Sequence, residues 1–218
     1  SSGTINAGSS LQLSGNIVNI GAVSTSACMT GIFLSSDAEY DNSDLEIVSF
    51  FTPILAPQEE EGFSENITIP VDFESGTYYL IVWADQENAV EEIDEDNNLA
   101  FRIITIRAVY PDLLISNVNA NLTQALPGQE ININAFCSNI GERNAGECTL
   151  KLAFSEDRFF DINDRAIVDY TIPDLATNSD FSFSNSYTVP EDIDPGQYYL
   201  VFWLDGNETI VESDESNN

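Results

Sequence analysis

The sequence contains no histidine among its 218 residues. Without an imidazole, the chain cannot build a Ser-His-Asp or Cys-His catalytic arrangement, and most zinc sites are excluded as well. Basic residues are scarce too: six Lys and Arg stand against 37 Asp and Glu, which gives a formal net charge of −31. Such a surface repels nucleic acid and anionic membranes, so we expect no nucleic-acid partner.

Long apolar runs are also missing. No stretch reaches the roughly 20 residues that span a bilayer, so we expect no membrane insertion in this segment. Helical periodicity is nearly absent, whereas 43% of the residues are hydrophobic, which is ample for packed cores. The length suits two domains of about 100 residues each.

The chain does contain a long internal repeat. Residues 1–98 align with residues 121–218 without a gap, and 30 of the 98 positions are identical. The identical pairs include Gly8 and Gly128, Asn19 and Asn139, Gly21 and Gly141, Cys28 and Cys148, and Trp83 and Trp203. A period this long indicates a duplicated domain rather than a solenoid turn.

Both copies alternate apolar and polar residues with period two, which is typical of half-buried strands. In the first copy we expect strands at residues 11–17, 28–34, 47–51, 67–71, 77–84 and 99–106, with a solvated turn at residues 57–62. Strands about ten residues apart, with turn signals between them, predict an antiparallel β-sandwich. The expected fold class is therefore all-β, with two tandem sandwiches at residues 1–107 and 108–218.

The two copies differ at their edges. The second begins with a strand at residues 111–118 that the first lacks, and the first ends with a strand at residues 99–106 that the second lacks. A sheet without an edge strand exposes unpaired backbone groups. Two interpretations stay open: the chain is a piece of a longer array, or another protomer supplies a strand by β-augmentation and builds a head-to-tail filament.

An acidic signature closes each copy. The pattern G-x-Y-Y-L-x-x-W-x-D, followed by E-x-D-E-x-N-N, occupies residues 76–98 and again residues 196–218. The signature residues are Glu92, Asp94, Glu95, Asn97 and Asn98, with Glu212, Asp214, Glu215, Asn217 and Asn218 in the second copy. Through these motifs, nearly the whole chain resembles CARDB, the cell-adhesion-related domain found in bacteria.

The resemblance implies an immunoglobulin-like sandwich on secreted or surface-anchored bacterial or archaeal proteins, without catalytic residues. Such domains are usually stalks, spacers or adhesive modules of longer chains. We therefore expect an extracellular, non-catalytic spacer whose partners are other domains of the same chain or identical protomers, bound through open sheet edges. A filament subunit is the alternative, and a carbohydrate-binding module is a lesser one.

Two acidic loops share the pattern D-x-x-x-D-x-[SN]-D and are the candidate cation sites. Calcium prefers six to eight oxygen ligands gathered from such a loop, although the spacing is not that of an EF-hand. The alternative is a solvated loop of Asx turns. The candidate ligands are Asp37, Asp41 and Asp44 in the first copy and Asp157, Asp161, Asn163 and Asp164 in the second.

The signature carries the same pair of alternatives. Asn and Asp side chains hydrogen-bond nearby backbone, so Asn97-Asn98 and Asn217-Asn218 are expected to hold this connection in place, with cation binding by Glu92, Asp94 and Glu95 as the second interpretation. Paired carboxylates can also hydrolyse glycosides, but here they lie in tight loops without a Trp-lined cleft, so we expect no enzyme. Trp83 and Trp203 are expected to pack in a core or on a sheet face, with sugar stacking as the minor alternative.

Cys137 and Cys148 fall on the inward faces of consecutive strands, so a disulfide between them is geometrically possible. Cys28 has no equivalent partner, because Ile17 stands at the position that matches Cys137, and we expect a buried free thiol. The sequons at Asn66, Asn121 and Asn207 are candidate glycosylation sites.

Overall fold

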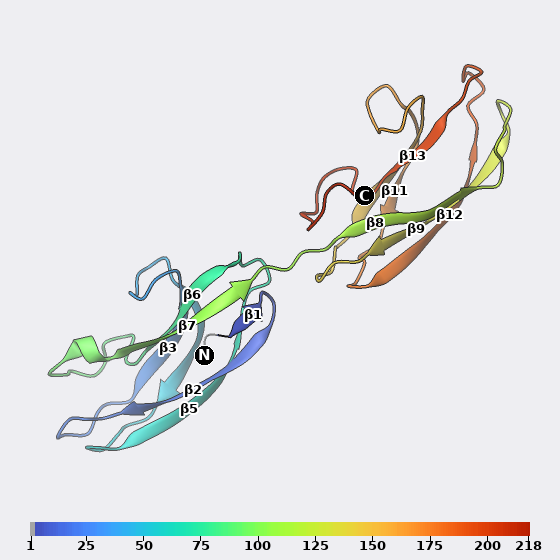
Figure 1. Cartoon of the computed structure of the whole chain (residues 1–218). Coiled ribbons are helices and arrows are strands. Elements are labelled where there is room, and N and C mark those ends of the chain that lie inside the picture. Colours follow the sequence, from blue (N-terminus) through green and yellow to red (C-terminus); the bar gives the residue numbers. More distant parts are fainter. Residues whose placement is uncertain (1–2) are drawn as a thin grey trace. The chain divides into compact units, whose positions relative to one another are not determined.

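The computed structural model describes residues 3–218 (Figure 1). The chain forms two compact units: unit 1 ends at Ala108, and unit 2 begins at Val109. The boundary lies one residue after the expected position, and the Ala108 amide donates a hydrogen bond to Ser75 Oγ of unit 1. The regular elements of both units are strands, apart from one short 3₁₀ turn, which confirms the all-β prediction.

Unit 1 packs a five-stranded sheet, in the order β1-β7-β6-β3-β4, with a two-stranded sheet formed by β2 and β5. Its elements are β1 (Thr4–Asn6), β2 (Ser10–Val18), β3 (Cys28–Ser35), β4 (Leu45–Thr52), β5 (Glu60–Thr68), β6 (Gly76–Trp83), the 3₁₀ turn η1 (Glu95–Asn97) and β7 (Leu99–Arg107). Neighbouring strands are antiparallel, except that β1 runs parallel to β7.

The core of unit 1 follows from the alternation along its strands. Every second residue of a strand points to the same side of its sheet, so the apolar set of each strand faces the opposite sheet. Ile32, Ile67 and Leu80 are fully buried there, and Ile104 and Ile106 of β7 complete the same cluster. The last strand therefore supplies part of the core as well as an edge.

Unit 2 has two three-stranded sheets, in the orders β11-β10-β13 and β12-β9-β8. Its strands are β8 (Leu113–Ala120), β9 (Glu130–Asn139), β10 (Cys148–Ser155), β11 (Arg165–Ile172), β12 (Ser179–Thr188) and β13 (Tyr199–Trp203). The longest ladder joins β9 and β12 from Glu130 to Asn139. The core between the sheets includes fully buried Leu113, Ile133 and Leu152.

The strand expected at residues 67–71 and the turn expected at residues 57–62 were both wrong, because one strand, β5, spans Glu60–Thr68. β5 begins at Glu60, within the segment that we expected to be a turn, because exposed Glu60 and Glu61 pair with Val18 and Ile17 of β2, the one partner of this edge strand among residues 3–218. Charged side chains are common on such edge strands because they discourage aggregation. The short β1 was not expected at all, since three residues are too few to show an alternation.

The two units differ in the strands at the edges of their sheets. Within residues 3–218, unit 1 has no counterpart of β8, and unit 2 has none of β7. Residues 124–126, which align with β1, form no strand. β13 has five residues, whereas the homologous β6 has eight. Without a neighbour on one side, the same Gly-x-Tyr-Tyr-Leu sequence therefore forms a shorter strand.

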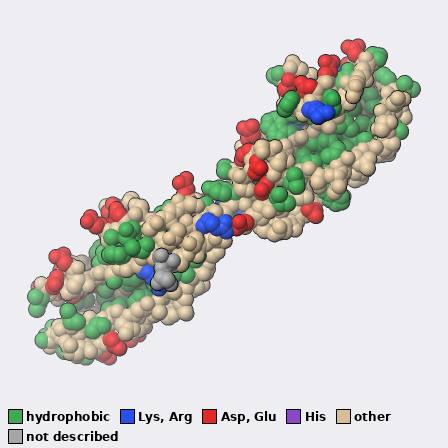
Figure 2. Space-filling view, viewed as in Figure 1, with side chains coloured by type: hydrophobic (Ala, Val, Ile, Leu, Met, Phe, Trp, Pro, Cys, Tyr) green, Lys and Arg blue, Asp and Glu red, His purple; other side chains and the backbone are tan. Residues whose placement is uncertain are grey.

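The surface reflects the composition. Figure 2 shows Asp and Glu side chains distributed over both units and Lys and Arg side chains at few places. In the part of the chain that the structure describes, no helix has the length and apolarity needed to cross a membrane.

Candidate functional site

The acidic loop of unit 1 connects β3 to β4, and its carboxylates face their own backbone. Asp37 Oδ1 accepts from the Glu39 amide at 2.9 Å, and Asp44 Oδ2 accepts from the Asp41 amide at 2.9 Å. Asp41 Oδ1 accepts from the hydroxyl and the amide of Ser43, and these bonds hold the pKa of Asp41 below its ordinary value. The loop is therefore a series of Asx turns.

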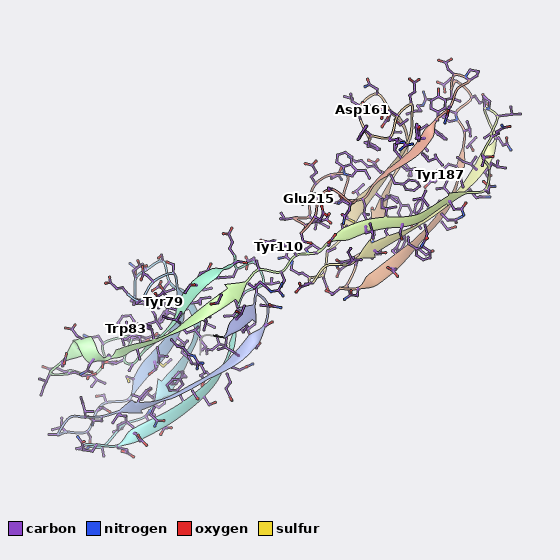
Figure 3. The ribbon with its side chains drawn as sticks, viewed as in Figure 1. Tyr79, Trp83, Tyr110, Asp161, Tyr187 and Glu215 are labelled. Atoms are coloured by element: carbon purple, nitrogen blue, oxygen red, sulfur yellow. The ribbon has the colours of Figure 1, made fainter. Side chains whose placement is uncertain are left out.

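The corresponding loop of unit 2 connects β10 to β11 and repeats this geometry. Asp157 Oδ1 accepts from the Phe159 amide at 2.8 Å, and Asp164 Oδ2 accepts from the Asp161 amide at 2.8 Å. Asp161, labelled in Figure 3, also accepts from the Asn163 amide. Among residues 3–218, no three acidic or thiol side chains converge closely enough to hold a metal ion. Calcium binding at these residues stays a prediction.

An aromatic side chain anchors each acidic loop to the outer face of a sheet. The Tyr40 ring centroid lies 4.4 Å from that of Trp83 and 4.8 Å from that of Phe33. In unit 2, Phe160 lies 5.4 Å from Trp203 by the same measure. Offset and edge contacts of this kind contribute about 0.5–1.5 kcal/mol beyond the area they bury. The tryptophans thus hold the loops on the sheets.

The aspartate that follows each tryptophan by two positions organises the next turn. Asp85 is 4% exposed and has φ +51°, and its two carboxylate oxygens accept from the amides of Ala89 and Val90. Asp205 has φ +50° and accepts from the Thr209 hydroxyl and the Ile210 amide. The motif W-x-D marked these positions in the sequence but did not indicate what the carboxylates hold.

The signature of unit 1 forms a closed turn. Glu95 Oε1 accepts from the Glu92 amide at 2.9 Å, and Asn98 Nδ2 donates to Glu92 Oε1 at 3.0 Å. Asp94 caps η1 by accepting from the Asp96 amide. The side chains of the signature therefore satisfy the backbone and one another.

The signature of unit 2 has the same hydrogen bonds within the turn: Glu215 Oε1 accepts from the Glu212 amide, and Asn218 Nδ2 donates to Glu212 Oε1. It also contacts the first strand of its unit. Glu212 Oε2 accepts from the Leu113 amide at 2.5 Å, and Asn217 Nδ2 donates to Asp112 Oδ1 at 2.8 Å. Figure 3 labels Glu215 on this turn. The signature therefore links the last turn of the unit to the start of β8.

Glu212 is a buried carboxyl with a displaced pKa. Its side chain is 8% exposed. Burial raises its pKa to about 7, the hydrogen bond from Leu113 opposes the rise, and repulsion from Glu215, Asp205 and Asp112 adds to it. At neutral pH this group is therefore close to its titration midpoint.

The signature residues of unit 1 are more exposed to solvent than those of unit 2. Glu92 is half-buried and Asn97 is exposed, because the described part of unit 1 has no strand at the position of β8. The difference extends to the glycines. A Cβ on Gly141 would lie 2.4 Å from the Asp112 nitrogen, whereas a Cβ on Gly21 would approach no closer than 3.0 Å, to the Asn19 side chain.

The three cysteines are free thiols in the structure. Cys137 lies on β9 and Cys148 on β10, so they belong to opposite sheets of one core. Burial, together with repulsion from Cys148, raises the pKa of Cys137 to about 12. The disulfide between them is not formed, and the pairing stays a prediction. Cys28 is half-buried rather than fully buried, and burial also raises its pKa.

The three sequons lie on the surface. Asn66 is exposed on β5, and Asn121 and Asn207 are exposed in loops. Asn121 Oδ1 accepts from the Asn132 amide, and Asn207 Nδ2 donates to Thr149 Oγ1. All three side chains are exposed to solvent, and glycosylation stays a prediction.

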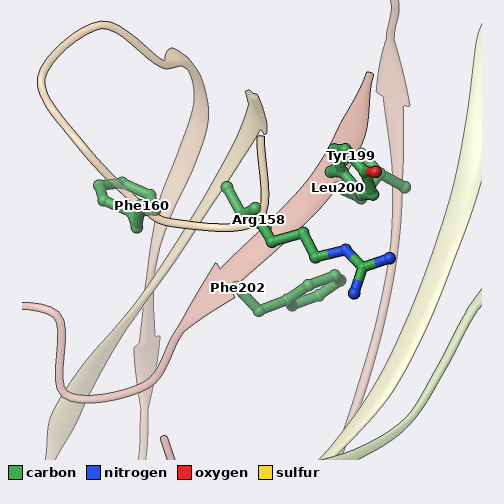
Figure 4. Close-up of a pocket in the computed structure, with 6 residues that line it drawn as sticks. Arg158, Phe160, Tyr199, Leu200 and Phe202 are labelled. Atoms are coloured by element: carbon green, nitrogen blue, oxygen red, sulfur yellow. The ribbon is translucent and has the colours of Figure 1, made fainter. Parts of the chain in front are cut away.

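A groove follows the free edge of β13. Its volume is about 280 Å³, and it is lined by Arg158, Phe160, Tyr199, Leu200, Val201 and Phe202 (Figure 4). The Arg158 guanidinium lies 5.6 Å from the Tyr199 ring centroid, within cation–π range. The sequence pattern did not indicate a lined groove here.

Comparisons with known proteins complete this description. The model of the CARDB family matches residues 1–102 and 110–218. Among curated proteins, none matches the chain.

Three solved structures are similar over most of this chain. A chaperone–tip adhesin complex of CFA/I fimbriae is 13% identical, with 91% of this chain and 93% of that chain covered and a TM-score of 0.27. The class 5 fimbriae chaperone CfaA is 10% identical, with 92% and 95% covered and a TM-score of 0.23. The secreted serine protease VesC from Vibrio cholerae is 13% identical, with 89% and 47% covered and a TM-score of 0.22. Scores this low support no transfer of function.

Proposed function

The chain belongs to the CARDB family, and on that premise we propose that it is a non-catalytic spacer of an extracellular prokaryotic surface protein, able to carry tension along the polypeptide. Its partners in this role are other protein modules. The adhesion-related character of the family supports the location and the role.

One pairing in unit 1 carries the proposal. β1, near the start of the unit, runs parallel to β7 at its end, so that Thr4 pairs with Thr105 and Asn6 with Arg107. When the two ends of a unit are pulled apart, parallel terminal strands must slide past each other along their length. Their hydrogen bonds are then loaded in shear and have to break together, which raises the barrier to forced unfolding.

Other contacts reinforce this pair. The Ala7 amide donates to the Arg107 carbonyl at 2.9 Å, and Arg107 Nε donates to Asn6 Oδ1 at 3.1 Å. On its other side, β7 pairs with β6 from Leu99 to Ile106. Tension that enters unit 1 through β7 is therefore shared between two neighbouring strands.

Single-molecule force spectroscopy on the full chain tests this role. We expect unit 1 to unfold at a higher force than unit 2, which has no parallel terminal pair among its described residues. Ala7→Pro removes the hydrogen bond that the Ala7 amide donates to the Arg107 carbonyl. The backbone should accept proline at this position, because Pro127 occupies the matching position of unit 2. The next residues, Gly8 and Gly128, have nearly the same φ angles, +79° and +77°.

The variant should lower the unfolding force of unit 1 and leave that of unit 2 unchanged. Equal forces for the two units, or a force peak of unit 1 that Ala7→Pro leaves unchanged, would contradict a tension-bearing role.

A second candidate role is a head-to-tail filament completed by strand donation between protomers. The observation that favours it is that the units expose different edges, β2 in unit 1 and β13 in unit 2, within residues 3–218. Non-identical edges allow a heterologous contact that does not close. Light scattering and electron microscopy of the purified chain, with and without a calcium chelator, distinguish filaments from monomers.

A further inference from the structure

We propose that β12 is a self-association strand: its free edge pairs antiparallel with β12 of a second copy of this chain, about a twofold axis at Ser184. Such a contact joins the three-stranded β12-β9-β8 sheets of the two copies into one continuous sheet. It closes at two copies, because both partners use the same surface. The inference goes beyond the spacer role, since it pairs two spacers side by side, and its failure would leave that role untouched.

The free edge of β12 belongs to the fold of the domain. Among residues 3–218, β12 pairs only with β9, and the homologous β5 of unit 1 pairs only with β2, so this edge is open in both units. β12 is ten residues long, lies at the rim of its sheet (Figure 1) and pairs with β9 without a bulge. A long and regular edge strand is a ready template for a strand of another chain.

The backbone groups at this edge are available for pairing. The Val189 amide donates to the Gln129 carbonyl at 2.9 Å, so Val189 directs its backbone groups toward β9. Successive residues of a strand direct these groups to alternate sides, and therefore Ser184 presents its own at the free edge. The Ser184 hydroxyl donates to Asn134 Oδ1 of β9 at 2.6 Å, so this side chain turns away from the edge.

The edge of β12 lacks the charges that protect the homologous edge of unit 1. β5 carries three glutamates, whereas β12 has one carboxylate. The aligned pairs are Glu60 and Asp180, Glu61 and Phe181, and Glu65 and Asn185. Charged side chains on an edge strand discourage pairing with another chain. In a chain with a net charge of −31, two copies can therefore meet at β12 with little repulsion at the contact itself.

The sequence of β12 is complementary to itself in the proposed register. With Ser184 opposite its own copy, Asp180 lies opposite the partner's Thr188, so no two like charges face each other across the contact. Phe181 then lies opposite the partner's Tyr187. Both aromatic side chains are half-buried at the margin of the core, and Figure 3 labels Tyr187. Cross-strand aromatic pairs of this kind stabilise antiparallel sheets.

Sedimentation equilibrium of the full chain in about 0.15 M sodium chloride tests the association. We expect the apparent mass to rise with concentration from 24.0 kDa, the mass of one chain, to twice that value and no further. Because the acidic surface opposes association, a higher ionic strength should strengthen it. A chain that stays monomeric up to about 1 mM, or a mass that grows past that of a dimer, would overturn the proposal.

Two charge variants test the surface. In Ser184→Lys and in Ser184→Glu, like charges lie opposite each other at the twofold axis, so each variant alone should dimerise at least about tenfold more weakly than the parent chain. An equimolar mixture of the two should restore dimerisation, because opposite charges then meet. The matched controls are Ser64→Lys and Ser64→Glu at the homologous exposed position of β5, and they should leave dimerisation unchanged.

Circular dichroism establishes that the charge variants are folded. Dimerisation of either Ser184 variant at parental strength, a mixture that does not restore it, or an equal loss in the Ser64 variants would each show that β12 is not the contact.

The register is tested by oxidative cross-linking. Ser184→Cys places a thiol opposite its own copy, at a Cα separation of about 5.5 Å that a disulfide can span, and should give a covalent dimer. Ser182→Cys should not, because its copy lies about 13 Å away along the partner strand, but it should cross-link to Ser186→Cys in a mixture. The parent chain, with its three free cysteines, is the control. Cross-linking of Ser182→Cys to itself as readily as Ser184→Cys would overturn the proposed pairing.

Discussion

Gly141 illustrates how one residue serves the two units differently. It lies against the backbone of Tyr110, Pro111 and Asp112, where a Cβ would come within 2.6 Å of three backbone atoms. Gly21, its counterpart in unit 1, has only the Asn19 side chain nearby. The same Asn-Ile-Gly sequence therefore has a steric reason for its glycine in unit 2 only.

We expect Gly141→Ala to destabilise unit 2 by about 2–3 kcal/mol, because the backbone at the start of β8 must move. Gly21→Ala is the matched control and should cost unit 1 less than about 1 kcal/mol. Urea unfolding, followed by tryptophan fluorescence in chains that keep only Trp83 or only Trp203, reports on each unit separately. Equal costs in the two units would show that the contact with β8 is not the cause.

Glu212 predicts a pH dependence of unit 2. Its pKa in the folded state, about 7, lies above the ordinary value of 4.5, so the folded protein binds the proton more tightly than the unfolded chain. Its contribution is most favourable below pH 4.5 and is lost as the pH rises through 7. The unfolding free energy of Glu212→Gln, taken relative to that of the parent chain, should therefore increase as the pH rises from 5 to 8, by roughly 1–3 kcal/mol.

Glu92→Gln is the control for this prediction. Glu92 accepts a hydrogen bond from Asn98, but among residues 3–218 it has no equivalent of the hydrogen bond that the Leu113 amide donates to Glu212. Urea titrations at several pH values measure the difference. A Glu212→Gln difference that stays constant from pH 5 to pH 8 would show that this carboxyl does not titrate in that range.

At the scale of elements, β6 and β13 show how far a neighbouring strand changes an element. They share Gly-x-Tyr-Tyr-Leu and Trp, yet β13 is three residues shorter and its leucine is less buried. The cause lies in β7, which covers one edge of β6 and inserts Ile104 and Ile106 into the core. Pairing, and not local sequence alone, therefore sets the length of these strands.

This difference predicts unequal costs for one substitution. Leu80→Ala should destabilise unit 1 by about 2–5 kcal/mol, as expected for a fully buried leucine. Leu200→Ala should cost unit 2 no more than about 1–2 kcal/mol, because its side chain is only half-buried. The single-tryptophan chains described above measure both values. A larger cost at Leu200 than at Leu80 would mean that the edge of β13 is covered in solution.

At the scale of the whole molecule, the net charge of −31 has the largest predictable effect. Like charges repel most strongly in the compact state, and salt screens them, since the Debye length falls from about 30 Å at 0.01 M to about 8 Å at 0.15 M ionic strength. We expect the unfolding free energy to rise by about 1–2 kcal/mol over this range.

Thermal unfolding in sodium chloride measures this rise, and calcium chloride at equal ionic strength is the control. Equal curves in the two salts would attribute the effect to screening. Extra stabilisation by calcium at submillimolar concentration would identify bound calcium, and Asp161→Asn would then locate it. A melting temperature that does not respond to sodium chloride would contradict the role of charge repulsion.

Sequence alone determined the all-β class and the duplication, because alternation and a gapless 120-residue offset are properties of the chain itself. It also identified the signature, in which bonds such as that between Glu95 and the Glu92 amide are local. Only the tertiary structure showed which residues far apart in the sequence contact one another. The parallel pairing of β1 with β7, the bond from Leu113 to Glu212, and the opposite sheets of Cys137 and Cys148 join residues that no local pattern relates.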